Sequence, residues 1–234
     1  MKTHHKSSER IVAKIFQDVF DKYDLMNDLM SLGIHRLWKK NFIHYLNPQK
    51  NTTLIDVASG TGDIAKLYLN KVKYKGSVCC VDVNKDMLDL NKKKFKESDK
   101  VKWFCNTAEK LPFKKNCFDY YTISFGIRNV NNINKTLKEA YRVLKPGGRF
   151  LCLEFSKVKN EILKKIYKIY SKSIPKIGKF VVGKSEPYDY LIDSIEEFMS
   201  QKDLLELLKK HNFEKVSYKN LSGGIVAIHS AWKI

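Results

Sequence analysis

Residues Asp56-Val-Ala-Ser-Gly60-Thr-Gly62-Asp63 decide the fold, because two closely spaced glycines stand between an apolar run and a helical pattern. The preceding run Thr53–Val57 indicates a buried strand. The following residues Asp63–Lys71 place apolar side chains at helical spacing. Glycines at such a strand-to-helix turn let the backbone approach a ligand closely. The stretch therefore predicts a ligand-binding turn at the carboxyl end of a strand in a wound α/β sheet.

Short apolar runs and helical stretches alternate along the rest of the chain. Up to residue 156 the order is β-α-β-α, which predicts a mostly parallel sheet with helices on both faces. Beyond that point, two closely spaced strand-like runs predict an antiparallel hairpin at one edge. The predicted strands are Thr53–Val57, Ser77–Val83, Val101–Cys105, Tyr120–Phe125, Arg149–Phe155, Glu214–Tyr218 and Gly224–His229, and the predicted helices are Asp63–Lys71, Lys85–Lys96, Ile133–Leu144, Glu161–Ser173 and Gln201–Lys210. Pro146-Gly147-Gly148 predicts a tight turn before the fifth strand.

The 234 residues are predicted to form a single domain, because no internal repeat or low-complexity linker divides them. Its expected parts are an N-terminal helical cap (1–50), a core with the glycine turn (51–156), a helical insert or lid (157–200), and a C-terminal helix with the hairpin (201–234). The cap contains an amphipathic segment over 11–20 and a helix around Ile34–Tyr45. Hydrophobic residues make up 43% of the chain, which excludes a disordered protein.

The most unusual property of the composition is its charge. Lysine and arginine number 44 against 25 aspartates and glutamates, so the formal net charge is +19. RNA, an anionic membrane surface and a coding bias toward lysine are three explanations. Only five of the basic residues are arginines, whereas proteins that read nucleic acids rely on the arginine fork. The lysine excess therefore favours coding bias over a nucleic-acid partner.

The cysteines and histidines indicate whether the protein binds a metal and in which cellular compartment it resides. Five cysteines without a Cys-x-x-Cys pair predict a reducing compartment and no zinc site, and the histidines show no metal-ligand spacing. No apolar run approaches the roughly 20 residues of a membrane helix. The first ten residues lack the apolar core of a signal peptide. We expect a cytoplasmic protein or, in a eukaryote, a peripheral protein on the matrix side of the mitochondrial inner membrane whose targeting segment is absent here.

Carboxylates around the glycine turn discriminate between two classes of ligand. Asp82 follows Gly62 by twenty residues, where an acid accepts hydrogen bonds from ribose hydroxyls. A dinucleotide would fit this pattern, but its pyrophosphate would be repelled by Asp56 and Asp63. S-adenosylmethionine carries an ammonium and a sulfonium instead, so the two aspartates favour the methyl donor. The alternative that they only cap the turn and helix stays open.

Two further loops follow predicted strands, on the ligand side of such sheets. Asn106–Glu109 comes after the third strand and Ser124–Asn129 after the fourth. The first is also compatible with a simple helix-capping turn around Thr107. Both loops are candidates for contacts with the adenine or the sulfonium.

Together with the glycine turn, motifs along nearly the whole chain resemble the ubiquinone/menaquinone biosynthesis C-methyltransferase family. The most specific are Lys22-Tyr-Asp-Leu-Met-Asn-Asp-Leu-Met30, Gly33-Ile-His-Arg-Leu-Trp38 and Phe125-Gly-Ile-Arg-Asn129, whereas Lys145-Pro-Gly-Gly148 is general to class I methyltransferases. Further matching segments are Thr122–Val130, Tyr141–Arg149, Leu153–Ser156, Tyr188–Leu191 and Gly223–His229. The resemblance implies a seven-stranded Rossmann-like fold and a 2-methoxy-6-polyprenyl-1,4-benzoquinol methylase, which moves a methyl group from S-adenosylmethionine to a ring carbon. Demethylmenaquinol is a second acceptor that it allows.

The resemblance also assigns site residues. Arg128 and Asn129 are expected at the acceptor. The expected donor-binding residues, including those taken from the turn itself, are Asp56, Gly60, Thr61, Gly62, Asp82, Thr107, Ala108 and Ser124. Two positions depart from the family pattern: Ser59 stands where the family mostly has glycine, and Thr107 where it has Asp or Asn. Both departures bear on donor affinity, and they motivate an alternative in which the chain is a non-catalytic component of a quinone-biosynthesis complex.

Methylation of an aromatic carbon needs a ring made electron-rich by removal of a hydroxyl proton. A guanidinium stays protonated and charged, so it is a poor direct base. We therefore expect Arg128 to stabilise the developing phenolate or to polarise a water, with Asn129 orienting the substrate. A purely structural ion pair of Arg128 is the alternative. His35 and Tyr23 rank second, as another base or part of a lid.

The predicted insert helix is amphipathic and basic. Ile162, Leu163, Ile166, Tyr167, Tyr170 and Ile174 share one side, and Lys164, Lys165, Lys168 and Lys172 share the other. Such a helix can lie on an anionic membrane, where a polyprenyl substrate resides, or it can be an ordinary lid. A protein complex and a homodimer are further open partners. An RNA methyltransferase is disfavoured, because no RNA-binding module accompanies the core.

Overall fold

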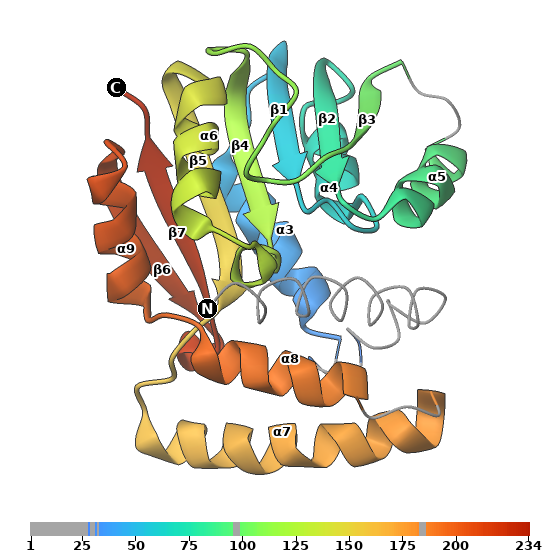
Figure 1. Ribbon diagram of the computed structural model, residues 1–234, viewed down its shortest axis with the longest axis vertical. Helices are drawn as coiled ribbons and strands as arrows, with labels where there is room; N and C mark the ends of the chain where they lie inside the picture. The colour runs from blue at the N-terminus through green and yellow to red at the C-terminus, as the bar shows by residue number, and fades with distance from the viewer. Residues whose placement is uncertain (1–27, 29–30, 32, 96–98, 183–185) are drawn as a thin grey trace.

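A seven-stranded sheet runs through the part of the chain that the structure describes, in the order β3-β2-β1-β4-β5-β7-β6 (Figure 1). The computed structural model describes residues 28, 31, 33–95, 99–182 and 186–234. The strands are β1 (Thr52–Val57), β2 (Gly76–Asp82), β3 (Val101–Cys105), β4 (Phe118–Ser124), β5 (Leu144–Phe155), β6 (Glu214–Leu221) and β7 (Val226–Trp232). The first five pair in parallel, and β7 pairs antiparallel with both β5 and β6. The predicted fold class, with its C-terminal antiparallel hairpin at one edge, is confirmed.

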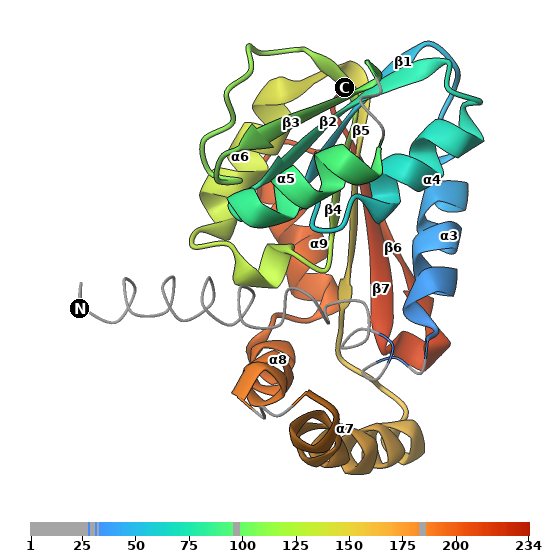
Figure 2. The ribbon, with the colours of Figure 1, turned by 90° about the vertical axis from the view of Figure 1, so that its right-hand side faces the viewer.

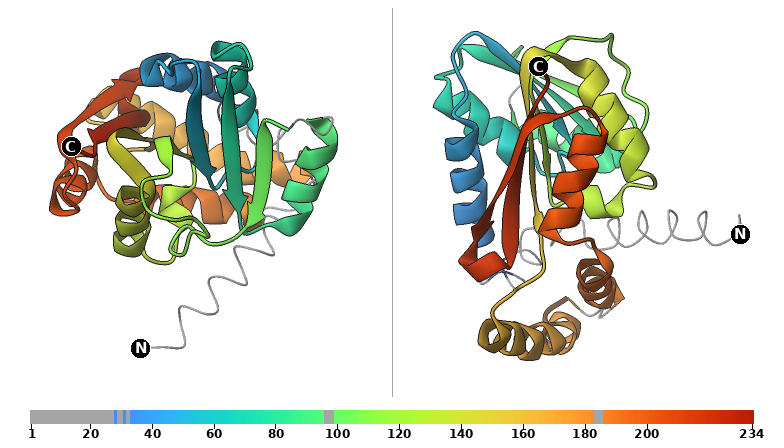
Figure 3. Two further views of the ribbon diagram at one scale, coloured as in Figure 1. Left: turned by 90° about the horizontal axis from the view of Figure 1, so that it is seen from above. Right: turned by 90° about the vertical axis from the view of Figure 1, so that its left-hand side faces the viewer.

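Helices cover both faces of this sheet, which explains why its central strands are apolar on both sides. The helices are α3 (His35–Leu46), α4 (Asp63–Lys71), α5 (Lys85–Lys94), α6 (Ile133–Val143), α7 (Glu161–Val182), α8 (Glu186–Glu197) and α9 (Gln201–Lys210), with short 3-10 turns η2 (Ile127–Asn129) and η3 (Ser222–Gly224). One face packs against α3 and α4, and the other against α6 and α9. Figure 3 shows α3 in blue and α9 in orange on opposite faces.

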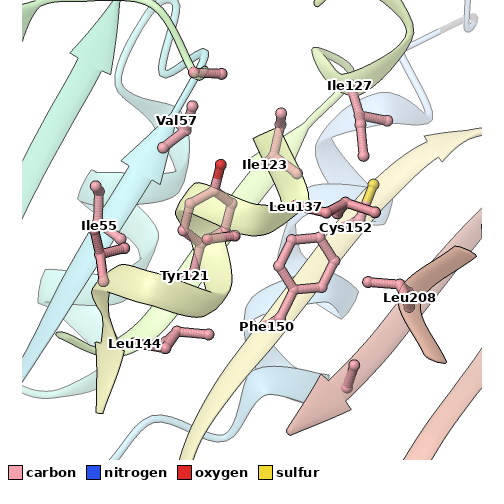
Figure 4. Packing of buried hydrophobic residues seen from close by; sticks show 14 of the residues in the cluster. Ile55, Val57, Tyr121, Ile123, Ile127, Leu137, Leu144, Phe150, Cys152 and Leu208 are labelled. Atoms are coloured by element: carbon pink, nitrogen blue, oxygen red, sulfur yellow. The ribbon is translucent and has the colours of Figure 1, made fainter. Parts of the chain in front are cut away.

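The core under α6 and α9 is filled by large side chains from the central strands. Tyr121 of β4 and Phe150 of β5 stack with ring centroids 5.3 Å apart, beside Leu137 of α6 and Leu208 of α9 (Figure 4). All four side chains are fully buried. Because this core holds the central strands rigidly, the loops at their carboxyl ends have a fixed support.

The helices α7 and α8 form a separate layer at the carboxyl ends of the parallel strands, with α8 nearer the sheet (Figures 1 and 2). The prediction ended the insert helix at Ser173, which was wrong, because α7 continues through Pro175 to Val182. The helix α8 was not predicted as an element. Its Tyr188 is fully buried and its Leu191 nearly so, which shows that tertiary packing stabilises this turn-rich stretch.

The start of β5 also differs from the prediction. The chain enters the strand at Leu144, and the pairing with β4 shifts register before Arg149. Pro146, Gly147 and Gly148 therefore lie in an irregular entry to the strand, where Gly147 has the positive φ, 78°, that the predicted turn requires. A side chain at Gly148 would lie 2.7 Å from the carbonyl oxygen of Lys145, so only glycine fits there.

Only part of the predicted N-terminal cap can be compared. The helix expected around Ile34–Tyr45 is confirmed as α3, whereas the segment over 11–20 lies outside the described residues. Trp38 and Phe42 of α3 are buried against the sheet and α4. Among the helices that the structure describes, none is both long and apolar enough to cross a membrane.

Candidate active site

The glycine turn between β1 and α4 has the backbone geometry that its sequence demands. Gly60 and Gly62 have φ values of 50° and 75°, in the left-handed region that favours glycine. A side chain at Gly62 would lie 2.9 Å from the ring of Phe95. A side chain at Gly60 would meet no atom within 4 Å. The turn is therefore closed by packing at Gly62 and open to a ligand at Gly60.

Asp82 at the end of β2 is joined to this turn. Its Oδ2 accepts a hydrogen bond from the backbone N–H of Gly60 at 2.9 Å, and its Oδ1 accepts one from the N–H of Asn84 at 2.9 Å. Burial raises the pKa of Asp82, and these backbone donors oppose that rise. Each oxygen keeps lone-pair capacity for a further donor, such as a ribose hydroxyl.

Asp56 lies in β1, one residue before the end of that strand. Its side chain is 1% exposed, and its Oδ1 accepts a hydrogen bond from Thr122 Oγ1 at 2.8 Å. Within the described residues, its Oδ2 has no hydrogen-bond partner. Burial raises the pKa of Asp56 to about 7, because a carboxylate in this apolar surrounding is poorly solvated. An ammonium or hydroxyl group would satisfy the unpaired oxygen.

The second predicted aspartate has a partner already. Asp63 Oδ2 lies 2.7 Å from Nζ of Lys39 in α3. Burial alone would raise the pKa of Asp63, but the adjacent Lys39 ammonium brings it below its ordinary value. The N-cap of α4 is Gly62, and no side chain caps this helix. Of the two carboxylates, Asp63 is therefore paired with Lys39, whereas Asp56 has a buried oxygen without a hydrogen-bond partner among the described residues.

The remaining predicted donor residues lie at the same ends of the strands. Ser124 ends β4, and its buried Oγ has no hydrogen-bond partner among the residues described. Thr61 lies in the glycine turn, half-buried. After β3, Ala108 is buried and Thr107 is exposed. The carboxyl ends of β1, β2, β3 and β4 thus bring the predicted set together along one edge (Figure 1).

Arg128 lies in η2 next to this edge, almost fully buried. Its Nη1 donates to Glu154 Oε1 and to the carbonyl of Phe125, both at 2.8 Å. Its Nε donates to Ser194 Oγ of α8 at 3.3 Å. The Arg128 and Glu154 side chains are 5% and 1% exposed. Within the described part of the chain, no hydrogen bond is donated by Nη2.

Sequence reasoning missed the partner of this arginine. Glu154 is the last residue but one of β5 and was noted only as part of the segment Leu153–Ser156. Burial raises the pKa of Glu154, and the guanidinium of Arg128 opposes that rise. An acid in an otherwise apolar strand was the signal that could have found it, because a buried charge needs a partner. The ion pair shows that the structural role weighed for Arg128 is present.

Asn129 connects η2 to the helix α8 above it. Its Oδ1 accepts a hydrogen bond from the hydroxyl of Tyr190 at 3.2 Å. The two turns of the site also touch each other, because a side chain at Gly126 would collide with Cβ of Ala58. Arg128 and Asn129, the residues predicted at the acceptor, therefore follow a turn that lies against the start of the glycine turn, an arrangement that a transfer between two bound molecules requires.

His35 and Tyr23 were the second-ranked candidates for a base or a lid. His35 Nδ1 lies 2.9 Å from Ser31 Oγ, and its side chain is buried; burial lowers its pKa. Tyr23 lies outside the described residues. Among the residues described, no three His, Cys, Asp or Glu side chains are grouped so that they could hold a metal ion.

A glycine turn at the end of β1, an acid at the end of β2, and the sheet order with an antiparallel β7 define a class I S-adenosylmethionine-dependent methyltransferase. Solved structures share this fold. One is an S-adenosylmethionine-dependent methyltransferase from Thermotoga maritima, with TM-score 0.66 and 21% identity over 94% of this chain and 99% of that one. Another is a phosphoethanolamine N-methyltransferase from Haemonchus contortus in complex with S-adenosylmethionine, with TM-score 0.63 and 16% identity over 84% of this chain and 52% of that one.

Sequence comparison identifies the family. The model of the ubiE/COQ5 methyltransferase family matches residues 2–233, and the chain belongs to that family. The ubiquinone/menaquinone biosynthesis C-methyltransferases of Rickettsia bellii and Rickettsia prowazekii are each 54% identical over 100% of this chain and 96% of their own length. The predicted resemblance, enzyme class and methyl donor are confirmed: the chain is an S-adenosylmethionine-dependent C-methyltransferase of quinone biosynthesis.

Proposed function

We propose that the enzyme methylates a ring carbon of a polyprenyl benzoquinol in ubiquinone biosynthesis, with demethylmenaquinol as the second acceptor. The observation that carries the proposal is the buried Arg128, paired with Glu154 at the strand ends, whose Nη2 donates no hydrogen bond to the described residues. The names of the Rickettsia relatives, which cover both quinone types, support the acceptor class. Assays with short-chain demethylated benzoquinol and demethylmenaquinol distinguish the two acceptors.

The groups at the carboxyl ends of the strands fit S-adenosylmethionine. Asp82 and Gly60 would hold its ribose side, and the unpaired Oδ2 of Asp56 would face its ammonium group. When bound, S-adenosylmethionine supplies a methyl group activated by a positively charged sulfur. The tight approach of Gly126 to Ala58 keeps the acceptor turn within reach of that group. Alignment of the two molecules supplies a large part of the rate acceleration.

Arg128 would act on the acceptor through charge. Its guanidinium stays protonated, so it stabilises the quinol oxygen as negative charge develops there. Glu154 holds the guanidinium from behind, and the hydrogen bond to Ser194 fixes its plane. Since these partners occupy Nε and Nη1, the Nη2 edge is the part that can face the acceptor.

The decisive experiment replaces Arg128. We expect Arg128→Ala to lower turnover at least about 100-fold, the scale of losing one stabilising donor. Calorimetry should show S-adenosylmethionine affinity unchanged. Equal losses of turnover and donor affinity would contradict the proposed role.

A matched variant separates catalysis from folding. Arg128→Ala leaves Glu154 buried without a partner, which destabilises proteins strongly. The double variant Arg128→Ala with Glu154→Gln removes both charges, so we expect its stability to recover while turnover stays low. Recovery of turnover together with stability would show that Arg128 is only structural. A donor-binding chain that methylates neither acceptor under any condition would instead support the non-catalytic alternative.

The helix α7 supports a second part of the proposal, association with an anionic membrane. Ile162, Ile166 and Ile169 recur at helical spacing and are 73%, 58% and 73% exposed. Lys164 and Lys165 beside them are exposed as well. An apolar stripe flanked by lysines matches helices that lie in the interface of anionic bilayers, where a polyprenyl acceptor resides.

Of the apolar residues predicted to share one side of α7, some face the protein and others face outward. Leu163 contacts the region of Gly223 in the protein, and Tyr167 and Tyr170 are half-buried. The isoleucines face outward, so a lid and a membrane surface can coexist on one helix. Sedimentation with cardiolipin-containing vesicles tests this. The triple change of Ile162, Ile166 and Ile169 to Ser should abolish binding, and no binding by the unchanged protein at physiological salt would refute it.

A further inference from the structure

The acceptor site includes a polar group from the lid that the family resemblance did not assign. We propose that Tyr190 of α8 is a further catalytic residue, whose hydroxyl donates a hydrogen bond to the acceptor oxygen next to Arg128. This inference rests on the proposed function, because it concerns the same acceptor site. It moves no atom: Tyr190 stabilises negative charge on the quinol oxygen and keeps its own proton.

The position of α8 directs Tyr190 toward the site. The helix packs against η2, and Ser194 one turn further along accepts the hydrogen bond of Arg128 Nε at 3.3 Å. Tyr190 itself donates to Asn129 Oδ1. Residues four apart lie on the same helix face, so Tyr190 and Ser194 both face η2. One face of α8 therefore serves Arg128 and Asn129 together.

The hydrogen bond of Tyr190 is suited to exchange. Its oxygen-to-oxygen distance of 3.2 Å is longer than the usual 2.7–2.8 Å for a hydroxyl donor. A phenolate oxygen is a stronger acceptor than the amide oxygen of Asn129. An acceptor entering between η2 and α8 can therefore take over this hydroxyl, while the Asn129 side chain becomes free to orient the ring.

The electrostatic surroundings of Tyr190 agree with its role as a hydrogen-bond donor. Burial raises the pKa of Tyr190, and the positive charge of Arg128 opposes this rise, which places the phenol within the field of the guanidinium. Tyr190 thus remains protonated at neutral pH and can donate, but it cannot act as a base. Tyr167 of α7 is affected by Arg128 in the same way, and burial raises its pKa to about 12.

The same helix contains a matched control. Tyr188 precedes Tyr190 by two residues, so its side chain leaves the opposite side of the helix. It is fully buried, and its hydroxyl has no hydrogen-bond partner in the described part of the protein. Replacing it with Phe removes a hydroxyl from the same segment without touching the acceptor site.

The test compares Tyr190→Phe with Tyr188→Phe in the full chain. We expect Tyr190→Phe to lower kcat about 10- to 100-fold, somewhat less than the loss of a main oxyanion donor. The acidic limb of its kcat–pH profile should move to higher pH, because the bound quinol loses a donor that favours its ionised form. Donor affinity should stay unchanged, and Tyr188→Phe should keep kcat within twofold.

A second readout does not depend on turnover. An alkylated 4-nitrophenol serves as an acceptor analogue whose ionised form absorbs visible light. We expect its bound pKa to be about one unit higher in Tyr190→Phe than in the unchanged protein, corresponding to a tenfold weaker preference for the phenolate. Tyr188→Phe should leave this bound pKa unchanged.

The outcomes separate this inference from the proposed function. If the unchanged enzyme methylates the benzoquinol but Tyr190→Phe retains kcat, pH profile and analogue pKa, only the role of Tyr190 is refuted. If Tyr190→Phe loses activity and thermal stability together while the analogue pKa stays constant, Tyr190 is structural and the inference is likewise overturned. If the unchanged enzyme methylates neither quinol, the proposed function itself fails.

Discussion

The proposed donor side and the proposed acceptor side of this site are built in different ways. The donor side is a continuous stretch, Asp56–Asp63, joined to one acid at the next strand end, Asp82. The acceptor side joins η2 to Glu154, 26 residues away from Arg128, and to Ser194, 66 residues away. The first can be read from a local motif, whereas the second exists only when distant elements pack. Substitutions on the two sides should therefore fail in different ways.

The largest effect is expected on the acceptor side. Glu154→Ala leaves the guanidinium of Arg128 buried without its carboxylate, which should lower the free energy of unfolding by about 3–5 kcal/mol. Urea denaturation measures this loss. Lys209→Ala breaks the exposed pair with Glu206 and serves as a control, with an expected change below about 0.5 kcal/mol. A comparably small loss in Glu154→Ala would show that this pair does not hold the acceptor side together.

An effect of intermediate size should appear in the pH dependence of stability at Asp56. Its pKa of about 7 in the folded protein lies above the ordinary 3.8, so the folded state binds more protons between those values. Stability is then greatest at the acidic end and falls as pH rises through this window, by on the order of 2–4 kcal/mol. Asp56→Asn should remove this dependence in urea unfolding between pH 4 and 7. An unchanged slope would assign the dependence to another group.

The smallest effect is expected at Asp82, and it concerns binding more than folding. Asp82→Asn retains one carbonyl-type oxygen but loses the charge that strengthens hydrogen bonds to hydroxyl groups. We expect donor affinity to fall about tenfold, or ~1.4 kcal/mol, with kcat at saturating donor nearly unchanged. Calorimetry and donor titration of the rate check this. A loss of kcat without a change in affinity would place Asp82 on the acceptor side of the comparison.

Elements defined by local sequence signals were predicted correctly, and elements that depend on tertiary packing were missed. The strand β1, the turn and α4 were predicted because alternation, glycine spacing and helix periodicity are all local signals. The helix α8 was missed, since its Tyr188 is buried only through tertiary packing. The end of α7 was missed because Pro175 is a strong local signal for termination, which packing overrides here.

The pairing of charged residues is what the sequence predicted least well. Asp63 and Asp56 look equivalent beside the glycine turn, but Lys39, 24 residues before Asp63, neutralises one of them and leaves the other with an unpaired oxygen. Nothing in the spacing of Lys39 indicates this pairing. Likewise, Arg128 was weighed as a catalytic group and as a structural ion pair, and the structure shows a buried guanidinium paired with Glu154.

By itself, the sequence determined the α/β fold, the position of the donor turn, the methyl donor and the family, because these depend on short motifs and their order. The tertiary structure alone decided which carboxylate stays unpaired, what holds Arg128, and which residues of α8 lie beside Arg128 and Asn129. Those properties depend on burial and on distances between groups far apart in the chain. The energies of these pairs depend on the burial of both charges away from water, and that burial occurs only when the strands and the helices α7 and α8 are packed.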